Sequence, residues 1–449
     1  MFSLNKIIYL KLLLSIKNYI QTLINLNLFS PLRFQMNNHI NFQFLGGVEE
    51  VGKLAMVLEM KDIRMLFEYG ISPTKPPSYP LPPPPIDLVL LTHAHLDHSG
   101  MIPWLFSRSD QKIITTQLTG EISDLLNKDS IKIAKSEGYS CPYTKNDITE
   151  AKNSIMPIQP KQKIDIGDNF EVICHDAGHI PGSVMYELVN DKKILFTGDF
   201  NVQDTRLVKG TKPVSCDILF IEGTYAGKDH PKKRDEIEKD LLDKIDEVVK
   251  RGGVAILPAF AVARSQELAI VLKNSGFNVW FDGMGKKVAK IYLDYPRYLR
   301  SSDELRKALN KLNLVHSDSG RKMALKSEVI LTSSGMMDGG PILHYMNKLK
   351  DDPKSAVILT GYQVEDSNAK RLVDKGRLDF YGVTEKIECE VSYFDFSAHA
   401  GHSEIIEFAK KCHPEKIILM HSDNRESLVE PLKDFAEVYT PSTGELVNL

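Results

Sequence analysis

Four side chains able to bind a metal, placed within six residues, constrain this chain of 449 residues more than any other feature. They follow the apolar run 88–91 in the order His93, His95, Asp97 and His98. Such a run is typical of a strand buried on both faces, and open α/β sheets bind their ligands at the carboxyl ends of such strands. Imidazole nitrogens and a carboxylate are suitable ligands for Zn²⁺ or a similar divalent ion. The spacing differs from the helix-borne His-Glu-x-x-His motif, so we expect a turn that directs all four side chains to one place.

The bulk composition is that of an ordinary globular protein, with 42% hydrophobic and 26% charged residues. The length allows two or three domains with full cores. A formal net charge of -3 neither favours nor excludes nucleic-acid binding, because a local basic groove does not show in the sum. The five cysteines are widely separated and form no Cys-x-x-Cys pair, which favours a reducing, cytoplasmic location and argues against cysteine as a metal ligand.

Residues 1–35 differ from the rest of the chain, because they are rich in Ile, Leu, Asn and Lys and contain no Asp or Glu. Lysines at positions 6, 11 and 17 interrupt the apolar pattern, so no stretch reaches the ~20 residues of a membrane span. No clear cleavage site of a signal peptide follows. We therefore expect no membrane association, and we interpret residues 1–35 as a leader that is not translated, with Met36 as the natural start.

The part of the chain before residue 225 alternates strand-like runs with turns and one long helical segment at 120–136. Polar residues follow three of these runs. His179 lies in a loop rich in Gly and Pro after the run 170–175, Asp199 follows the run 193–196, and Glu222 follows the run 218–221. Each acid or histidine taken alone carries little weight, but the repeated placement at strand ends favours a shared site.

From about residue 225 the pattern changes to an amphipathic helix at 228–251 and strand-like runs that alternate with helices up to about residue 380. This alternation predicts a doubly wound α/β domain. Residues 381–449 return to the first pattern. His399 and His402 precede a helical segment at 403–411, and the strand-like run 416–420 leads directly to His421.

The motif His93-x-His95-x-Asp97-His98, followed by His179, Asp199 and His421, resembles the metallo-β-lactamase superfamily. Glu222, the segment Ser397-Ala398-His399 and the α/β insert are similar to its β-CASP branch, which includes ribonuclease J and the endonuclease subunit of the cleavage and polyadenylation specificity factor. The resemblance covers residues of about 40 to 449. It implies an α/β protein in which residues 36–224 and 381–449 form a four-layer αβ/βα sandwich, with the β-CASP domain at 225–380 inserted as a cap.

The resemblance also implies two Zn²⁺ ions per chain and assigns a role to each ligand. His93, His95 and His179 resemble the ligands of one ion, Asp97, His98 and His421 resemble those of the other, and Asp199 is similar to the carboxylate that bridges them. Two cations can neutralise a phosphodiester and lower the pKa of a bridging water. Because Asp97 is similar to a ligand of one of these ions, the resemblance includes it among the catalytic residues.

Proton transfer to the leaving oxygen is assigned by the same resemblance. His399 is similar to the histidine near the scissile phosphate, and Glu222 is similar to the acid that orients it. A second histidine, His402, leaves the choice of proton donor open, although the Ser-Ala-His context favours His399. Where relatives carry Asp, this chain has Glu68, which leaves open whether the longer acid still supports a ligand histidine.

Two segments of the expected cap are candidates for substrate binding. Ser333, Ser334 and Gly335 resemble a glycine-containing loop whose hydroxyl and N–H groups can hold a phosphate. Arg264 is a candidate contact to an RNA backbone, and a purely structural arginine is an equal alternative.

These features together predict a zinc-dependent ribonuclease that acts on single-stranded RNA in RNA processing or decay, as a 5′-to-3′ exonuclease, an endonuclease or both. The sequence does not decide between RNA and DNA as the substrate, and it leaves open whether the chain forms a homodimer. A small-molecule metallohydrolase, of the thioesterase or lactonase type, and an inactive RNA-binding subunit are the alternatives. The large insert and His399 argue against the first alternative, and the complete set of seven metal ligands argues against the second.

Overall fold

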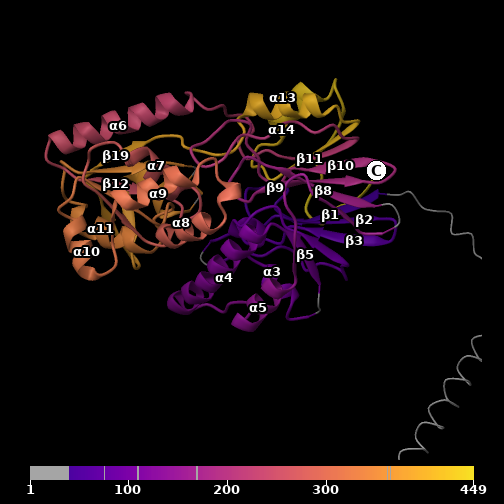
Figure 1. The fold of residues 1–449 in the computed structure, drawn as a ribbon, viewed down its shortest axis with the longest axis horizontal. Helices are drawn as coiled ribbons and strands as arrows, with labels where there is room; N and C mark the ends of the chain where they lie inside the picture. Colours follow the sequence, from indigo (N-terminus) through magenta and orange to yellow (C-terminus); the bar gives the residue numbers. More distant parts are fainter. Residues whose placement is uncertain (1–39, 75, 109–110, 168–169, 362, 365) are drawn as a thin grey trace, which may run out of the picture.

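The structure is a computed structural model that describes residues 40–449 except 75, 109–110, 168–169, 362 and 365. The expected leader and Met36 lie outside the described residues. The chain forms a sandwich of two sheets and a cap with its own sheet, which lie side by side (Figure 1). Among the residues that the structure describes, no helix has both the length and the apolar character needed to cross a membrane.

The first sheet of the sandwich has seven strands. Four of them, from the two ends of the described chain, pair antiparallel with one another. Its remaining strands run parallel, so that β4 lies between β3 and β5 in the interior of the sheet. In spatial order the strands are β22 (Leu446–Asn448), β1 (Ile40–Gly46), β2 (Ala55–Met60), β3 (Ile63–Phe67), β4 (Leu88–Leu90), β5 (Lys112–Thr115) and β6 (Ile155–Pro157).

The second sheet of the sandwich brings the end of the chain beside its middle, because β20 pairs in parallel with β11. Strand β11 also runs parallel to β10, so that β10, β11 and β20 all end at the same edge. In spatial order the strands are β21 (Glu437–Tyr439), β20 (Lys416–Met420), β11 (Ile218–Glu222), β10 (Lys193–Phe196), β9 (Val184–Val189), β8 (Glu171–Asp176) and β7 (Lys163–Asp165).

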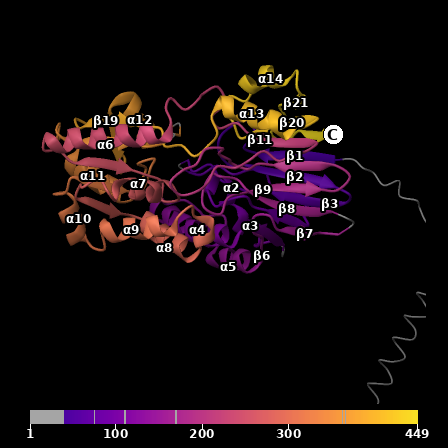
Figure 2. The same ribbon diagram turned by 45° about the horizontal axis from the view of Figure 1, so that its top comes forward.

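Aromatic side chains fill the space between the two sheets. The rings of Phe42 and Phe220 pack edge to face with their centroids 5.1 Å apart, and those of Phe67 and Phe196 lie 4.6 Å apart. All four are buried, which gives this layer a large apolar area. The outer face of the first sheet packs against α3 (Ile102–Leu105), α4 (Gln117–Glu137) and α5 (Lys145–Asn153), and that of the second against α13 (His402–Cys412) and α14 (Glu426–Leu432). The expected four-layer αβ/βα sandwich is confirmed (Figures 1 and 2).

The cap has a parallel sheet with helices on both faces, which is the doubly wound arrangement that the sequence predicts. Its strands, in spatial order, are β14 (Asn313–Leu314), β13 (Val279–Asp282), β15 (Val329–Thr332), β12 (Ala255–Pro258), β16 (Ala356–Leu359) and β19 (Glu390–Tyr393). One face packs against α6 (Arg234–Lys250), α7 (Arg264–Leu272), α8 (Gly285–Asp294) and α9 (Ser302–Lys311), and the other against α10 (Asp318–Ala324), α11 (Pro341–Leu349) and α12 (Asn368–Lys375). A hairpin of β17 (Arg377–Phe380) and β18 (Val383–Lys386) follows α12.

Two features of the cap differ from the sequence-based expectation. The edge strand β19 pairs with β16, so the cap sheet extends beyond the expected boundary at residue 380. This strand is short and alternates half-buried with exposed residues, so it lacks the kind of apolar run that predicted β12, β13, β15 and β16. The first helix of the cap begins at Arg234 rather than at residue 228. Pro231 disfavours helical backbone at the residue before it, so residues 225–233 form a connection rather than a helical turn.

Candidate metal centre and active site

The ligand loop 91–99 is held rigidly where it leaves the first sheet. After β4 the chain runs without regular structure to His95 and then forms one helical turn, α2 (Leu96–Ser99). The N–H of Leu54 donates to the carbonyl of Asp97 over 2.8 Å. A Cβ at Gly70 would lie only 1.7 Å from that same oxygen, so only glycine allows the neighbouring loop to pack this closely. The loop therefore presents its side chains from a fixed backbone.

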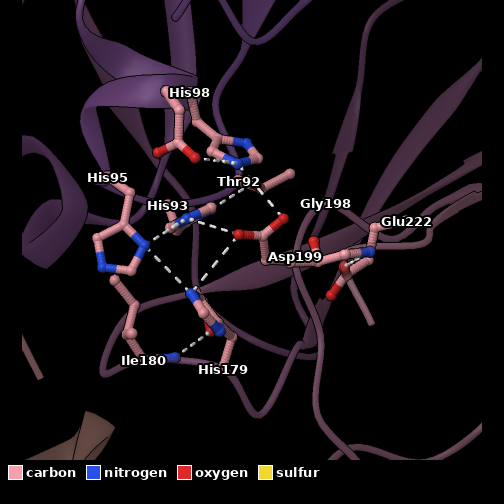
Figure 3. Close-up of polar contacts among 12 residues, drawn as sticks. Thr92, His93, His95, His98, His179, Ile180, Gly198, Asp199 and Glu222 are labelled. Carbon is pink, nitrogen blue, oxygen red and sulfur yellow. Dashed lines mark hydrogen bonds and ion pairs between the residues drawn. The ribbon is translucent and has the colours of Figure 1, made fainter. Parts of the chain in front are cut away.

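Three histidines from two loops form the first ligand group. Nδ1 of His95 lies 3.1 Å from Nε2 of His93 and 3.2 Å from Nε2 of His179. Oδ2 of Asp199 completes the group at 3.5 Å from Nε2 of His93 and 3.7 Å from Nε2 of His179. Figure 3 shows these side chains converging from both sheets. These four atoms surround a space of the size that one ion needs.

The second ligand group lies on the other side of Asp199. Oδ2 of Asp97 lies 3.9 Å from Nε2 of His98 and 3.6 Å from Nε2 of His421. Oδ1 of Asp199 lies 3.3 Å from Nε2 of His98 and 3.8 Å from Nε2 of His421. The two carboxylate oxygens of Asp199 thus face different histidine groups.

Several buried polar atoms at this place have no hydrogen-bond partner among the described residues. They are both ring nitrogens of His98, both ring nitrogens of His421, and Oδ1 of Asp199. Leaving such atoms unsatisfied costs roughly 1–3 kcal/mol each, so native proteins rarely do so without a bound ion or water. The donors are nitrogen and carboxylate oxygen, with no thiolate, which suits Zn²⁺ or a similar divalent ion. The residues present therefore fit a metal site.

Neighbouring polar groups orient the ligand histidines. Nδ1 of His93 lies 3.0 Å from the hydroxyl of Thr92, and Nδ1 of His179 donates to the carbonyl of Ala398 over 2.8 Å. The buried carboxylate of Glu68 accepts from the N–H of Thr92 over 2.9 Å, and its other oxygen lies 3.4 Å from Nδ1 of His98. Glu68 therefore lies close enough to His98 for an ion pair, although no hydrogen bond joins the two side chains. Such contacts fix the tautomer and the ring orientation of a ligand.

Burial and mutual repulsion keep part of this histidine cluster neutral. Burial lowers the pKa of His93 and His179 well below the usual value, and it lowers that of His95 to about 4. Neutral imidazole is the form that binds a metal. Burial also opposes charge on His98 and Asp199, but the attraction between them prevails, raising the pKa of His98 and lowering that of Asp199. His93, His95 and His179 are therefore ready to bind a cation beside an ionised Asp199, whereas His98 must lose a proton before it binds one.

His399 and Glu222 form a pair beside the first ligand group. Nδ1 of His399 lies 3.0 Å from Oε1 of Glu222, and the ring centroid of His399 is 4.5 Å from that of His179. Burial alone would lower the pKa of His399, but the carboxylates of Glu222 and Asp199 outweigh it and raise the pKa to about 9. Glu222 is itself fixed, because it accepts from the backbone N–H groups of Phe200 and Thr224. The structure thus brings together His399 and Glu222 as the sequence predicts.

His402 points elsewhere. Its Nδ1 accepts a hydrogen bond from the N–H of Gly227 over 3.0 Å, and it starts α13 outside the metal centre. The geometry therefore favours His399 as the histidine that faces the ligand groups.

A pocket between the sandwich and the cap opens beside the first ligand group, and Arg264 lies in its wall. Arg264 begins α7 and is only 9% exposed, yet its Nη1 has no hydrogen-bond partner among the described residues. A buried guanidinium group with a free N–H is suited to an anionic ligand. Residues of the pocket wall include His95, His179 and His399 from the sandwich, and Phe260, Arg264 and Glu267 from the cap.

The predicted loop Ser333, Ser334 and Gly335 follows β15 and is not part of the described pocket wall. The hydroxyl of Ser333 accepts from the N–H of Met284 over 3.1 Å. A Cβ at Gly335 would lie 2.9 Å from the backbone nitrogen of Phe260. The loop therefore reaches the pocket through Phe260, against which it packs.

One polar cluster beside His399 was not predicted from the sequence. Asp395 accepts from the hydroxyl of Tyr225 over 3.1 Å and from Nδ1 of His230 over 2.9 Å. The ring of Tyr225 stacks parallel to that of His399 with the centroids 6.0 Å apart. The only signals in the sequence are the positions of Tyr225 shortly after Glu222 and of Asp395 shortly before His399.

Comparison with family models divides the chain into three matches. Residues 55–252 match the "Metallo-beta-lactamase superfamily", residues 264–372 match the "Beta-Casp domain", and residues 384–441 match the "Zn-dependent metallo-hydrolase RNA specificity domain". A crystal structure of a protein of unknown function from Enterococcus faecalis V583 shares the fold, with a TM-score of 0.58 at 16% identity over 92% of this chain and 100% of that one.

Several archaeal proteins are similar to this chain over most of its length. It is 37% identical to "Probable RNase MJ4" of Methanocaldococcus jannaschii, over 90% of this chain and 99% of that protein. It is 34% identical to "RNase aCSPSF2" of Saccharolobus solfataricus, over 92% and 86%, and 33% identical to "Transcription termination factor FttA" of Methanocaldococcus jannaschii, over 89% and 68%.

The sandwich and its histidine and aspartate cluster define a metallohydrolase of the metallo-β-lactamase superfamily. With the inserted cap and the closing segment, the chain belongs to the β-CASP branch of that superfamily, as the resemblance in the sequence implies.

Adding a divalent ion should stabilise the metal-free protein, because the ion would satisfy buried atoms that otherwise have no partner. At a concentration 100 times the dissociation constant, binding to the folded state adds ~2.7 kcal/mol. We expect zinc to raise the melting temperature of the wild type clearly and that of His98→Ala much less. The control is His316→Ala, which removes an exposed histidine in the cap. A rise in His98→Ala as large as that in the control would contradict the assignment.

Proposed function

We propose that this chain is a zinc-dependent ribonuclease that hydrolyses phosphodiester bonds of single-stranded RNA at a centre of two metal ions. The observation that carries the proposal is the position of Asp199, whose two oxygens face two separate groups of ligands, with the His399–Glu222 pair directly beside them. The names of two similar proteins contain "RNase", and the last segment matches a family model described as an RNA specificity domain. These names support RNA over a small ester as the substrate.

The residues of the chain divide the chemistry among them. A pair of divalent cations, when bound, supplies charge neutralisation for the phosphodiester and activation of water. His93, His95 and His179 would hold one ion, Asp97, His98 and His421 the other, and Asp199 both. His399 has Nδ1 engaged with Glu222, which leaves Nε2 to face the pocket and donate a proton to the leaving oxygen.

Binding of the RNA strand falls to groups of the cap. Arg264 lines the same pocket as His399, where its guanidinium group would bind a phosphate of the backbone. Ser333, Ser334 and Gly335 remain predicted RNA-binding residues. Gly335 packs against Phe260, which lies in the pocket wall, so this loop supports the wall. An unpaired strand fits a pocket enclosed by two domains better than a duplex does. The cytoplasmic location and a homodimer also stay predictions.

Removing one ligand of the second ion should abolish cleavage. Asp97→Ala removes a carboxylate that lies 3.6 Å from His421, so we expect the rate of hydrolysis of a labelled single-stranded RNA to fall by at least ~10²-fold, which is the scale of losing an electrostatic stabiliser. The measurement is product formation on a denaturing gel, with circular dichroism to show that the variant is folded and His316→Ala as the matched control. Undiminished cleavage by purified Asp97→Ala would refute the two-metal centre.

The mode of cleavage can be read from the ends of the substrate. Metal-loaded protein is incubated with RNAs that carry a 5′-monophosphate, a 5′-triphosphate or a 5′-hydroxyl, and product lengths are followed over time. We expect cleavage of at least the monophosphorylated RNA, because Arg264 offers a binding group for a phosphate beside the centre. Mononucleotides released only from 5′-monophosphate RNA indicate a 5′-to-3′ exonuclease, and fragments independent of the end indicate an endonuclease. No product from any RNA would contradict the proposal.

The pH dependence of the rate tests the His399–Glu222 pair. His399 must be protonated to donate, so the rate falls as the pH rises through its pKa, which its neighbours raise to about 9. Glu222→Gln removes the negative charge that raises this pKa most, so the alkaline fall should move to lower pH by about one unit or more. Bound cations would lower the pKa of His399 in the wild type and in Glu222→Gln alike, so the difference between the two pH profiles is still expected. An alkaline limb at the same pH in both proteins would exclude this role for Glu222.

A further inference from the structure

The chain crosses between the sandwich and the cap twice, and the two crossings are joined beside His399. The first crossing follows β11 and leads to α6, and the second follows β19 and leads to α13 (Figure 1). Asp395, on the second crossing, accepts hydrogen bonds from Tyr225 and His230 of the first, and also from the N–H of Ser397 over 3.0 Å. Asp395 is 92% buried, so these bonds form out of contact with water.

The segment Ser397–His399 is held by a side chain at each of its three carbonyl groups. Arg234 donates to the carbonyl of Ser397, His179 donates to that of Ala398 over 2.8 Å, and Nε2 of His230 donates to that of His399 over 2.9 Å. The segment carries the proposed proton donor and also orients a metal ligand. Any shift of its backbone would therefore change the position of the His399 ring relative to both ligand groups.

His230 has an acceptor at each ring nitrogen. Nδ1 lies 2.9 Å from a carboxylate oxygen of Asp395, and Nε2 lies 2.9 Å from the carbonyl oxygen of His399. Neither acceptor can donate a proton when Asp395 is ionised, so both bonds exist together only when His230 is the doubly protonated imidazolium. A neutral ring keeps one of the two.

The groups around His230 favour this charged form. Burial alone lowers its pKa, but the hydrogen bond and the charge of Asp395 outweigh burial and raise the pKa above the usual value. Glu404 of α13 adds negative charge from the second crossing. On the first crossing, Asp229 lies nearby and the ring of Tyr225 packs 4.9 Å from that of His230.

We propose that His230 is a positioning residue for proton donation: held by Asp395, it fixes the carbonyl of His399 and thereby the ring of His399 beside the metal centre. His230 is not among the described residues of the pocket wall, so it acts through His399 and not on the RNA. This inference rests on the proposed function. It also gives the cap a role in catalysis, because the connection into the cap provides the group that holds the proton donor.

Two substitutions at this position separate the two hydrogen bonds. The amide nitrogen of His230→Gln can occupy the place of Nε2 and donate to the carbonyl of His399. The amide nitrogen of His230→Asn can occupy the place of Nδ1 and donate to Asp395, which leaves the carbonyl of His399 without its donor. We expect His230→Asn to lower kcat on labelled single-stranded RNA about 10- to 100-fold with KM nearly unchanged, and His230→Gln to stay within about fivefold of the wild type.

A double-mutant cycle with His399→Ala tests whether His230 acts through His399. If it does, His230→Asn should slow cleavage in the wild type but change the remaining rate of His399→Ala by less than about twofold. Metal content and melting temperature of each variant show that the protein is folded and loaded. A general structural role would slow Asn and Gln variants alike and would slow His399→Ala as well, and either result would overturn the proposal.

The same experiment separates this inference from the proposed function. If the wild type cleaves RNA and His399→Ala does not slow it, the assignment of the proton donor is wrong, and the inference about His230 is overturned with it. If the wild type cleaves, His399→Ala is slow and His230→Asn equals the wild type, only the inference about His230 is wrong. If the wild type cleaves no RNA, both are overturned.

Discussion

A single buried carboxylate, Asp199, is the interaction on which the rest of the site depends. It is 2% exposed and its two oxygens face four histidines that come from three separate segments of the chain. A charge buried this deeply is costly unless opposite charge or metal compensates it. Gly198, at φ 51°, allows the approach, because a Cβ there would lie 2.5 Å from the hydroxyl of Thr92. The two sheets are arranged so that their strand ends bring these histidines around one carboxylate.

The sandwich meets this need by ending several strands at one edge. Strands β10, β11 and β20 run parallel in one sheet and deliver Asp199, Glu222 and His421, while β4 of the other sheet leads to the cluster that begins at His93. The cap then adds what a metal centre alone lacks. Its connections hold the backbone of His399, and its helix α7 places Arg264 in the pocket wall. In the proposed function, metal binding and substrate handling therefore come from different domains that meet at His399.

The sequence predicted most residues of the candidate metal centre because each of them follows an apolar run, where the end of a strand is the simple interpretation. The doubly wound cap followed from the alternation of strand-like runs and helices, and the four-layer sandwich followed from the resemblance to β-CASP proteins. The hydrogen bond between His230 and Asp395 could not be predicted in this way, because it joins residues 165 positions apart that lie in irregular connections. Strand β19 was missed because it lacks an apolar run, and the burial of Arg264 depends on packing between domains that no local pattern shows.

The central claim is that Asp199 joins two metal ions into one centre that hydrolyses RNA. The most direct test is the number of metal ions per chain, measured by elemental analysis of dialysed protein, together with RNA cleavage, in the wild type and in Asp199→Ala. The account predicts about two ions per wild-type chain, and in Asp199→Ala the loss of at least one ion together with the loss of cleavage. Two retained ions, or cleavage by Asp199→Ala at the rate of the wild type, would contradict it.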